Sequence, residues 1–131
     1  MVDQLVMVRL IRPVIFYEMN RISFDFDGCV GHKPHIQRLA QELCRDPYNE
    51  VHIITRRYGS KRPGVKDEVS DVLQIASILN IPKERIHFMD RQYKWPKIKE
   101  LGIQIHWDDD MDDIKLIRTN CPDCRALLTL G

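Results

Sequence analysis

With 131 residues, of which 44% are hydrophobic and 30% charged, the chain is long enough for one domain with its own core and too short for two. Its net charge of +1 gives no electrostatic reason to expect a membrane or nucleic-acid surface as an obligatory partner. No apolar run approaches the roughly 20 residues that a bilayer crossing needs. We therefore expect a cytoplasmic globular protein whose cysteines are reduced thiols.

The first 18 residues are rich in apolar side chains, but Arg9, Arg12 and Pro13 interrupt them. They lack the continuous apolar stretch and the small-residue cleavage site of a signal peptide. An edge strand, a frayed arm and a misassigned start ahead of Met19 all stay open for this segment. We treat residues 1–18 as an N-terminal extension and residues 19–131 as the domain.

The segment Arg21-Ile-Ser-Phe-Asp-Phe-Asp-Gly28 predicts a buried strand of about six residues that ends in two carboxylates, Asp25 and Asp27. A buried carboxylate is costly unless a cation neutralises it. Gly28 allows the chain to turn sharply away from the strand end. The strand end therefore predicts a metal site.

Strand-like and helix-like segments alternate through the rest of the chain. Helical spacing and helix-end signals predict helices at about 33–45, 65–79, 96–101 and 111–118. Apolar runs predict strands at 51–55, 86–89, 103–107 and 126–130. Such alternation is typical of βαβ units, so we predict a three-layer, Rossmann-like α/β fold around a mostly parallel five-stranded sheet.

Polar residues follow the predicted strands where ligands bind in such sheets, beyond the carboxyl ends. Asp25 and Asp27 end the first strand, and Thr55 ends the second. Asp108 and Asp109 end the fourth. Parallel strands bring these ends to one edge of the sheet, so we expect the side chains to meet there.

This set of motifs, in this order, resembles the haloacid dehalogenase (HAD) superfamily of phosphohydrolases. The resemblance covers about residues 21–118 and rests on four elements: Asp25-Phe-Asp27-Gly28, Thr55, a lysine before the fourth strand, and Asp108-Asp109. The distance from Leu101-Gly102 at which similar family sequences place this lysine favours Lys94, with Lys97 as the second choice. Asp113 fits the spacing of a further acidic residue in one variant of the family.

The resemblance implies a phosphatase that cleaves a phosphate monoester through an aspartyl-phosphate. Asp25 would be the nucleophile, and Asp27 would protonate the leaving oxygen and then activate water. Thr55 and Lys94 would bind the oxygens of the transferring phosphoryl group. Mg²⁺ would be the cofactor, held by residues at two strand ends: Asp25, Asp27 through its backbone carbonyl, Asp109 and Asp108.

The spacing of the motifs leaves no room for the cap domain that many members of this family carry. In that family an uncapped site is typical of members that act on large phosphorylated substrates, although it also permits a small-molecule phosphatase that closes its site by oligomerising. Arg56 and Arg57 follow Thr55 directly, and with Gly28 we predict that they contact substrate; a solvated basic loop is the alternative. We expect a nucleotide or a nucleic-acid end as substrate, and the sequence predicts no oligomeric state.

Two other classes of protein stay open. One is a HAD-fold binding or regulatory protein without turnover. The other is a receiver-like phospho-acceptor module, although in such a module the Thr and the acidic residues follow other strands than they do in this chain.

The pair Cys121 and Cys124 lacks the second pair that a structural zinc needs, so we expect ordinary thiols. We expect His106 to be a hydrogen-bonded strand histidine rather than a ligand.

Overall fold

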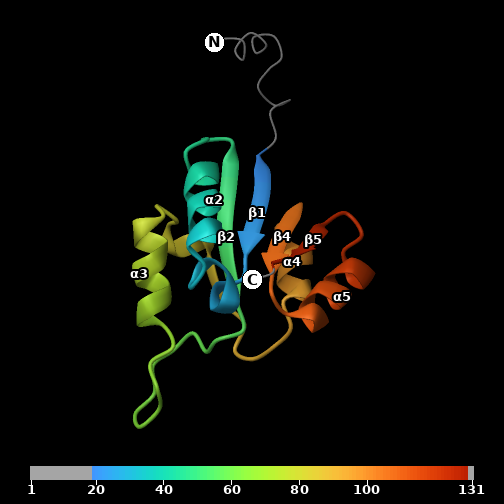
Figure 1. The fold of residues 1–131 in the computed structure, drawn as a ribbon. Coiled ribbons are helices and arrows are strands. Elements are labelled where there is room, and N and C mark those ends of the chain that lie inside the picture. Colours follow the sequence, from blue (N-terminus) through green and yellow to red (C-terminus); the bar gives the residue numbers. More distant parts are fainter. Residues whose placement is uncertain (1–18, 130–131) are drawn as a thin grey trace.

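The structure is a computed structural model that describes residues 19–129. Within that range one sheet has the strand order β3-β2-β1-β4-β5, and every pairing is parallel (Figure 1). Its strands are β1 (Asn20–Phe24), β2 (Asn49–Thr55), β3 (Ile86–Phe88), β4 (Ile105–Asp108) and β5 (Arg125–Leu128). The predicted α/β, Rossmann-like fold is confirmed. The predicted extension at residues 1–18 and the last predicted strand residue, Leu130, lie outside the described residues.

Helices cover both faces of the sheet and make three layers (Figure 1). On one face α2 (Pro34–Cys44) and α3 (Ser70–Ile78) pack on Ile22, Phe24 and Ile53. On the other face α4 (Trp95–Leu101) and α5 (Met111–Asn120) pack on Ile54. Successive side chains of a strand point to opposite faces, so adjacent residues of β2, such as Ile53 and Ile54, serve different cores.

The second core face also carries a row of buried polar side chains. Ser23 of β1 is in register with His52 of β2 and with His106 of β4. His52 contacts His87 of β3, with 2.9 Å between Nδ1 and Nε2, and its Nε2 lies 3.0 Å from a carboxylate oxygen of Glu50. The polar groups in this row therefore have partners despite their burial.

The loop after β2 is longer than predicted, and the helix that follows it begins later. We expected a helix from about 65, but α3 begins at Ser70. The carboxylate of Asp67 accepts hydrogen bonds from the backbone N–H groups of Val69 and Ser70, which makes a polar turn ahead of the helix. Residues 56–69 instead form a loop that projects from the carboxyl end of the sheet (Figure 1).

The other predicted elements are present, with ends shifted by a few residues. β4 begins at Ile105 rather than at Ile103, because Gly102 follows the last residue of α4 with a left-handed φ of 67° and the backbone N–H of Ile103 still bonds to the helix. Short turns also occur at η2 (Phe26–Val30) and η3 (Lys83–Arg85). No cap domain interrupts the fold between residues 19 and 129.

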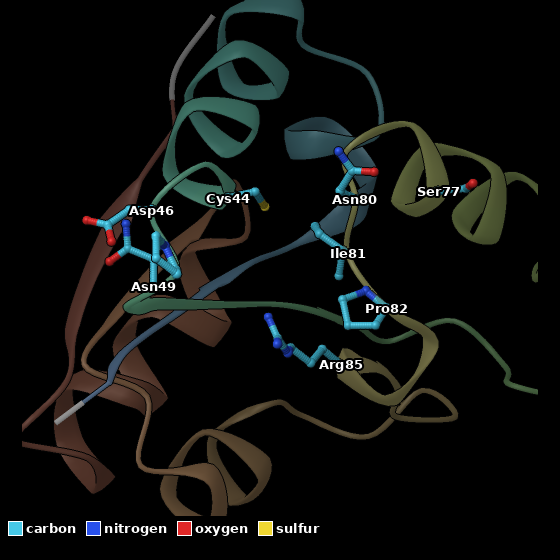
Figure 2. A pocket seen from close by; sticks show the side chains of 9 residues that line it. Cys44, Asp46, Asn49, Ser77, Asn80, Ile81, Pro82 and Arg85 are labelled. Atoms are coloured by element: carbon cyan, nitrogen blue, oxygen red, sulfur yellow. The ribbon is translucent and has the colours of Figure 1, made fainter. Parts of the chain in front are cut away.

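The opposite, amino end of the sheet carries an open groove of about 560 Å³ (Figure 2). Its lining includes Cys44, Asn49, Asn80 and Arg85, from the end of α2, the start of β2 and the segment that precedes β3. Larger than the cavity at the carboxyl end, it nevertheless lies away from the residues predicted to do chemistry. None of the helices in the described part of the chain is long and apolar enough to cross a membrane.

Candidate active site

The carboxyl ends of the strands surround a cavity of about 310 Å³. β1 lies between β2 and β4, so the strand order reverses beside it, which is where ligands bind in open α/β sheets. Every predicted site residue except Asp108 lines this cavity: Asp25, Asp27, Gly28, Thr55, Arg56, Arg57, Lys94 and Asp109. Arg91 and Asp110, which we did not predict, line it as well.

Lys94 is buried beneath the cavity, with 2% of its side chain exposed. Its ammonium donates to Asp25 Oδ1 at 2.9 Å and to Asp108 Oδ2 at 2.7 Å. Lys97, the second choice, pairs with Glu100 at 3.2 Å instead. The structure thus brings Lys94 to the predicted nucleophile, because α4 begins immediately after it.

Asp113 of α5 holds Lys94 from the far side. Its Oδ1 accepts a hydrogen bond from the backbone N–H of Lys94 at 3.0 Å, and its Oδ2 lies 3.3 Å from the lysine Nζ. That contact is an ion pair rather than a hydrogen bond, so Asp113 Oδ2 is a buried oxygen whose partner is the lysine charge. Asp113 therefore supports the lysine rather than facing the cavity.

Charge at this site is unbalanced. Burial alone would lower the pKa of Lys94, but Asp25, Asp108 and Asp113 outweigh it and raise that pKa. Burial raises the pKa of Asp25 well above its usual value, and the Asp108 carboxylate adds to the effect while Lys94 opposes it. One ammonium therefore faces more negative charge than it can neutralise.

Three carboxylates can reach a common cation. One oxygen from each of Asp25, Asp108 and Asp109 lies within 4.8 Å of the other two. Opposite ligands of a Mg²⁺ ion are about 4.2 Å apart, so the three oxygens lie close to the span of one ion. Gly28 leaves space for this arrangement: its φ is +68°, and a Cβ there would lie 1.9 Å from Asp109 Oδ2. The residues present therefore fit a hard divalent cation.

Asp108 is less available as a ligand than Asp25 or Asp109. Burial would raise its pKa, but hydrogen bonds from His106 and Lys94 hold that pKa well below its usual range. Oδ2 accepts from both of these groups, and Oδ1 accepts from the backbone N–H of Asp110 at 3.0 Å. Asp109, in contrast, is exposed at the cavity.

Asp27, the predicted acid and base, is held in an ion pair. Arg57 donates to its two carboxylate oxygens at 2.9 and 2.7 Å, and Arg57 also bonds to Asp71 at 2.6 Å. The hydrogen bonds from Arg57 lower the pKa of Asp27. Arg57 therefore orients a carboxylate here, and the predicted contact of Arg57 with substrate stays a prediction.

Arg56 lies at the mouth of the cavity, stacked 4.5 Å over the ring of Tyr93. Two of its nitrogens donate to the carbonyl of Arg91 at 3.3 and 3.0 Å. Asp90 and Arg91 both have left-handed backbones, with φ of 50° and 71°, which is costly for residues with a side chain. Nothing in the sequence predicted that Arg91 lines the cavity. Its position depends on backbone hydrogen bonds from residues 90 and 91 to residues 56 and 57, which no local pattern indicates.

Thr55 ends β2 as predicted and is buried at the base of the cavity, where its hydroxyl accepts from the backbone N–H of Arg57 at 3.3 Å. His106 is a hydrogen-bonded strand histidine, as expected. Cys121 and Cys124 are free and buried, and burial raises the pKa of Cys124 to about 12. These thiols therefore stay protonated and take no part in the site.

A comparison with protein-family models and with curated proteins finds no match to this chain.

Proposed function

We propose that the protein is a Mg²⁺-dependent phosphohydrolase that cleaves a phosphate monoester through an aspartyl-phosphate on Asp25. The convergence of Asp25, Asp109 and Lys94 at one cavity carries the proposal. These residues come from three separate segments: the end of β1, the turn after β4 and the start of α4. The resemblance of their motifs to the HAD superfamily supports the same reaction.

Mg²⁺ would be held by Asp25 and Asp109, with the backbone carbonyl of Asp27 and the Asp108 carboxylate as further candidates. When bound, it would neutralise the carboxylate and phosphate oxygens as they approach each other. Asp25 forms a bond to phosphorus while the bond from phosphorus to the leaving oxygen breaks. Lys94 and Thr55 stabilise the charge on the phosphoryl oxygens.

Water then attacks the phosphorus of the aspartyl-phosphate, inorganic phosphate leaves, and the Asp25 carboxylate is restored. Asp27 accepts the proton of that water, a step for which an ionised carboxylate is suited. The earlier step, protonation of the leaving oxygen, needs a protonated Asp27, and Arg57 disfavours that form. Esters whose leaving group needs no proton should therefore be the most reactive test substrates.

For the substrate we propose a nucleotide or a nucleic-acid end. No cap domain covers the cavity within residues 19–129, so a large substrate can reach it. The loop of residues 56–69 beside it is basic, with Arg56, Arg57, Lys61, Arg62 and Lys66. Positive charge at the mouth favours an ester that carries further phosphates along its chain.

The test is hydrolysis of p-nitrophenyl phosphate by the purified full-length chain with Mg²⁺ or with EDTA. A panel of nucleotides and of 3′- and 5′-phosphorylated oligonucleotides follows. We expect hydrolysis that EDTA stops and Mg²⁺ restores, and that Asp25→Asn abolishes. Asp123→Asn, an exposed carboxylate beyond the other end of the sheet, is the control and keeps full activity. Undiminished hydrolysis by Asp25→Asn rules out the covalent mechanism.

The ion pair between Arg57 and Asp27 favours a second candidate, a HAD-fold protein that binds phosphate esters without turnover, because its acid is held as an anion. Acid-quenched reactions separate the two. A phosphoenzyme that forms and decays supports the phosphatase, whereas ester binding without product supports the binding protein. The sheet order does not support a receiver-like module, because receivers have the order 2-1-3-4-5.

A further inference from the structure

Beneath the cavity, Ser23, His106 and Asp108 form a buried chain of hydrogen bonds, and the proposed reaction gives Ser23 and His106 no part. Ser23 Oγ lies 2.7 Å from His106 Nδ1, and His106 Nε2 lies 2.8 Å from Asp108 Oδ2. All three side chains are 0% exposed. They come from the middle of β1 and from β4, two strands that pair side by side.

The partners fix the direction of each hydrogen bond. The Asp108 carboxylate can only accept, so Nε2 of His106 carries the proton and donates to it. In the neutral imidazole Nδ1 is then the acceptor, and the Ser23 hydroxyl donates to it. This set is not a nucleophilic Ser-His-Asp triad, because Ser23 is a donor here and its complete burial keeps substrate away from Oγ.

These hydrogen bonds act on the Asp108 carboxylate, whose Oδ2 accepts from both His106 and Lys94. Asp110 donates to the other oxygen through its backbone N–H. The carboxylate of Asp108 is therefore fixed from three directions. If His106 no longer donated, Asp108 could rotate, and the lysine ammonium would move with it toward Asp25 or Asp113.

We propose that His106, supported by Ser23, is a positioning residue: it holds the Asp108 carboxylate and thereby places the Lys94 ammonium where the phosphoryl oxygens bind. The inference rests on the proposed function only for its effect on catalysis. The placement of the ammonium is a property of the protein alone. Outer hydrogen-bond partners of this kind affect activity by about 10–100-fold in other sites.

The chain offers a matched control in His52. It is buried on the same face of the sheet, in register with Ser23 from the other side, and bonds to His87 and Glu50 rather than to Asp108. A substitution at His52 therefore disturbs the same buried row without touching the site. Any effect common to both histidines reflects folding, and any effect confined to His106 reflects positioning.

The test compares three full-length variants. His106→Asn keeps an amide near Ser23 but is too short to reach Asp108, whereas the longer side chain of His106→Gln can donate to Asp108. We expect His106→Asn to lower kcat about 10–100-fold with little change in KM. His106→Gln recovers most of the rate, and His52→Asn keeps kcat although it loses stability. Equal losses in kcat from His106→Asn and His52→Asn, or no recovery with glutamine, would overturn the inference.

A second measurement needs no activity. The buried Lys94 ammonium has three carboxylate neighbours, so its ¹⁵N–¹H cross-peak should be visible by NMR in the metal-free protein. We expect that cross-peak to shift or broaden in His106→Asn and to persist in His106→Gln and His52→Asn. An unchanged cross-peak in His106→Asn, or none in the unaltered protein, overturns the positioning role.

The two measurements separate the two proposals. If the unaltered protein hydrolyses no monoester, the proposed function fails while the NMR spectra still decide the placement of Lys94. If His106→Asn does not fold, Ser23→Ala takes its place, because it removes only the hydroxyl that supports Nδ1. We then expect a smaller change in the same direction, and no change in the Lys94 cross-peak would refute the support from Ser23.

Discussion

Lys94 combines two roles that demand different surroundings. Its burial and its three carboxylate partners make it a structural centre of the α4–α5 side, while its ammonium also faces the cavity. Removal of a buried cation leaves its anions unpaired, which is more costly than removal of the whole ion pair. The residue therefore matters for stability independently of any reaction.

We expect Lys94→Met to lower the free energy of unfolding by about 3–5 kcal/mol in metal-free protein near neutral pH. Urea unfolding checks this, with Lys97→Met as the control. Lys97 pairs with Glu100 at the surface, where an ion pair contributes about 0–1 kcal/mol. Equal losses for the two variants would mean that the carboxylates around Lys94 do not depend on it.

At the residue scale the sequence predicted which side chains gather at the cavity but not the hydrogen-bond partner of each one. Strand ends were enough to predict that Asp25 and Asp109 meet at one cavity, and the family resemblance added Lys94. The ion pair of Asp27 with Arg57 was not predictable in the same way. Arg57 follows β2 in a loop whose path depends on tertiary contacts with Glu68 and Asp71, and no local pattern encodes these.

At the scale of elements, the turn after β1 determines whether the carboxylates can gather. Gly28 and Gly64 both have left-handed backbones, with φ of 68° and 74°. A Cβ at Gly28 would collide with Asp109, whereas a Cβ at Gly64 would meet nothing within 4 Å. The two glycines therefore separate backbone strain from crowding of the site.

We expect Gly64→Ala to cost about 1–2 kcal/mol of stability, because of its left-handed backbone, and to leave Mg²⁺ binding unchanged. Gly28→Ala bears the same strain and should also weaken Mg²⁺ binding by about tenfold or more, since Asp109 must move. Calorimetric titration with Mg²⁺ and thermal unfolding measure the two effects. Equal Mg²⁺ affinities in the two variants would show that Asp109 tolerates a side chain at this turn.

The contact between His52 of β2 and His87 of β3 predicts how the stability of the protein changes at acidic pH. Burial and the neighbouring His52 lower the pKa of His87 from its ordinary 6.5 to about 4. Folded His87 stays neutral where unfolded His87 takes up a proton, so unfolding binds a proton in this window. Stability from this group is therefore full above pH 6.5 and is lost as the pH falls toward 4.

We expect His87→Gln to reduce the difference in unfolding free energy between about pH 7.5 and about pH 5 by about 1 kcal/mol, allowing for the partly exposed ring. Urea unfolding at both pH values gives this difference. The exposed His35→Gln serves as the comparison and should leave it unchanged. An acid response that His87→Gln does not alter would assign the loss to other groups.

For the whole molecule, alternation of strands and helices was sufficient to predict the layers and the parallel sheet. The order of strands was a matter of topology, and right-handed connections leave few choices. The boundaries around 56–69 were less predictable, because Asp67 and its hydrogen bonds delay α3 until Ser70. The periodicity of apolar residues predicts that Val65 is in that helix, because a periodic pattern carries no information about a polar turn of this kind.

The excess of carboxylates at the carboxyl end of the sheet predicts that Mg²⁺ stabilises the entire fold. A ligand that binds only the folded state adds about 2.7 kcal/mol when its concentration is 100 times Kd. We expect Mg²⁺ to raise the melting temperature in differential scanning calorimetry, and Asp109→Asn to lose that rise. Asp112→Asn, exposed in the first turn of α5, should keep it. A rise that survives in Asp109→Asn would place the ion elsewhere.

The central position of β1 sets the order in which a nascent chain can become functional. Ser23 and His106 are 83 positions apart, and Asp25 and Lys94 are 69 apart. The ribosome therefore delivers Asp25 long before its counter-ion Lys94, and β1 stays unpaired on one side until β4 has emerged. A chain released before β4 is made would hold unpaired acids and an unpaired strand edge, so the proposed activity requires that residues up to Asp109 have been synthesised.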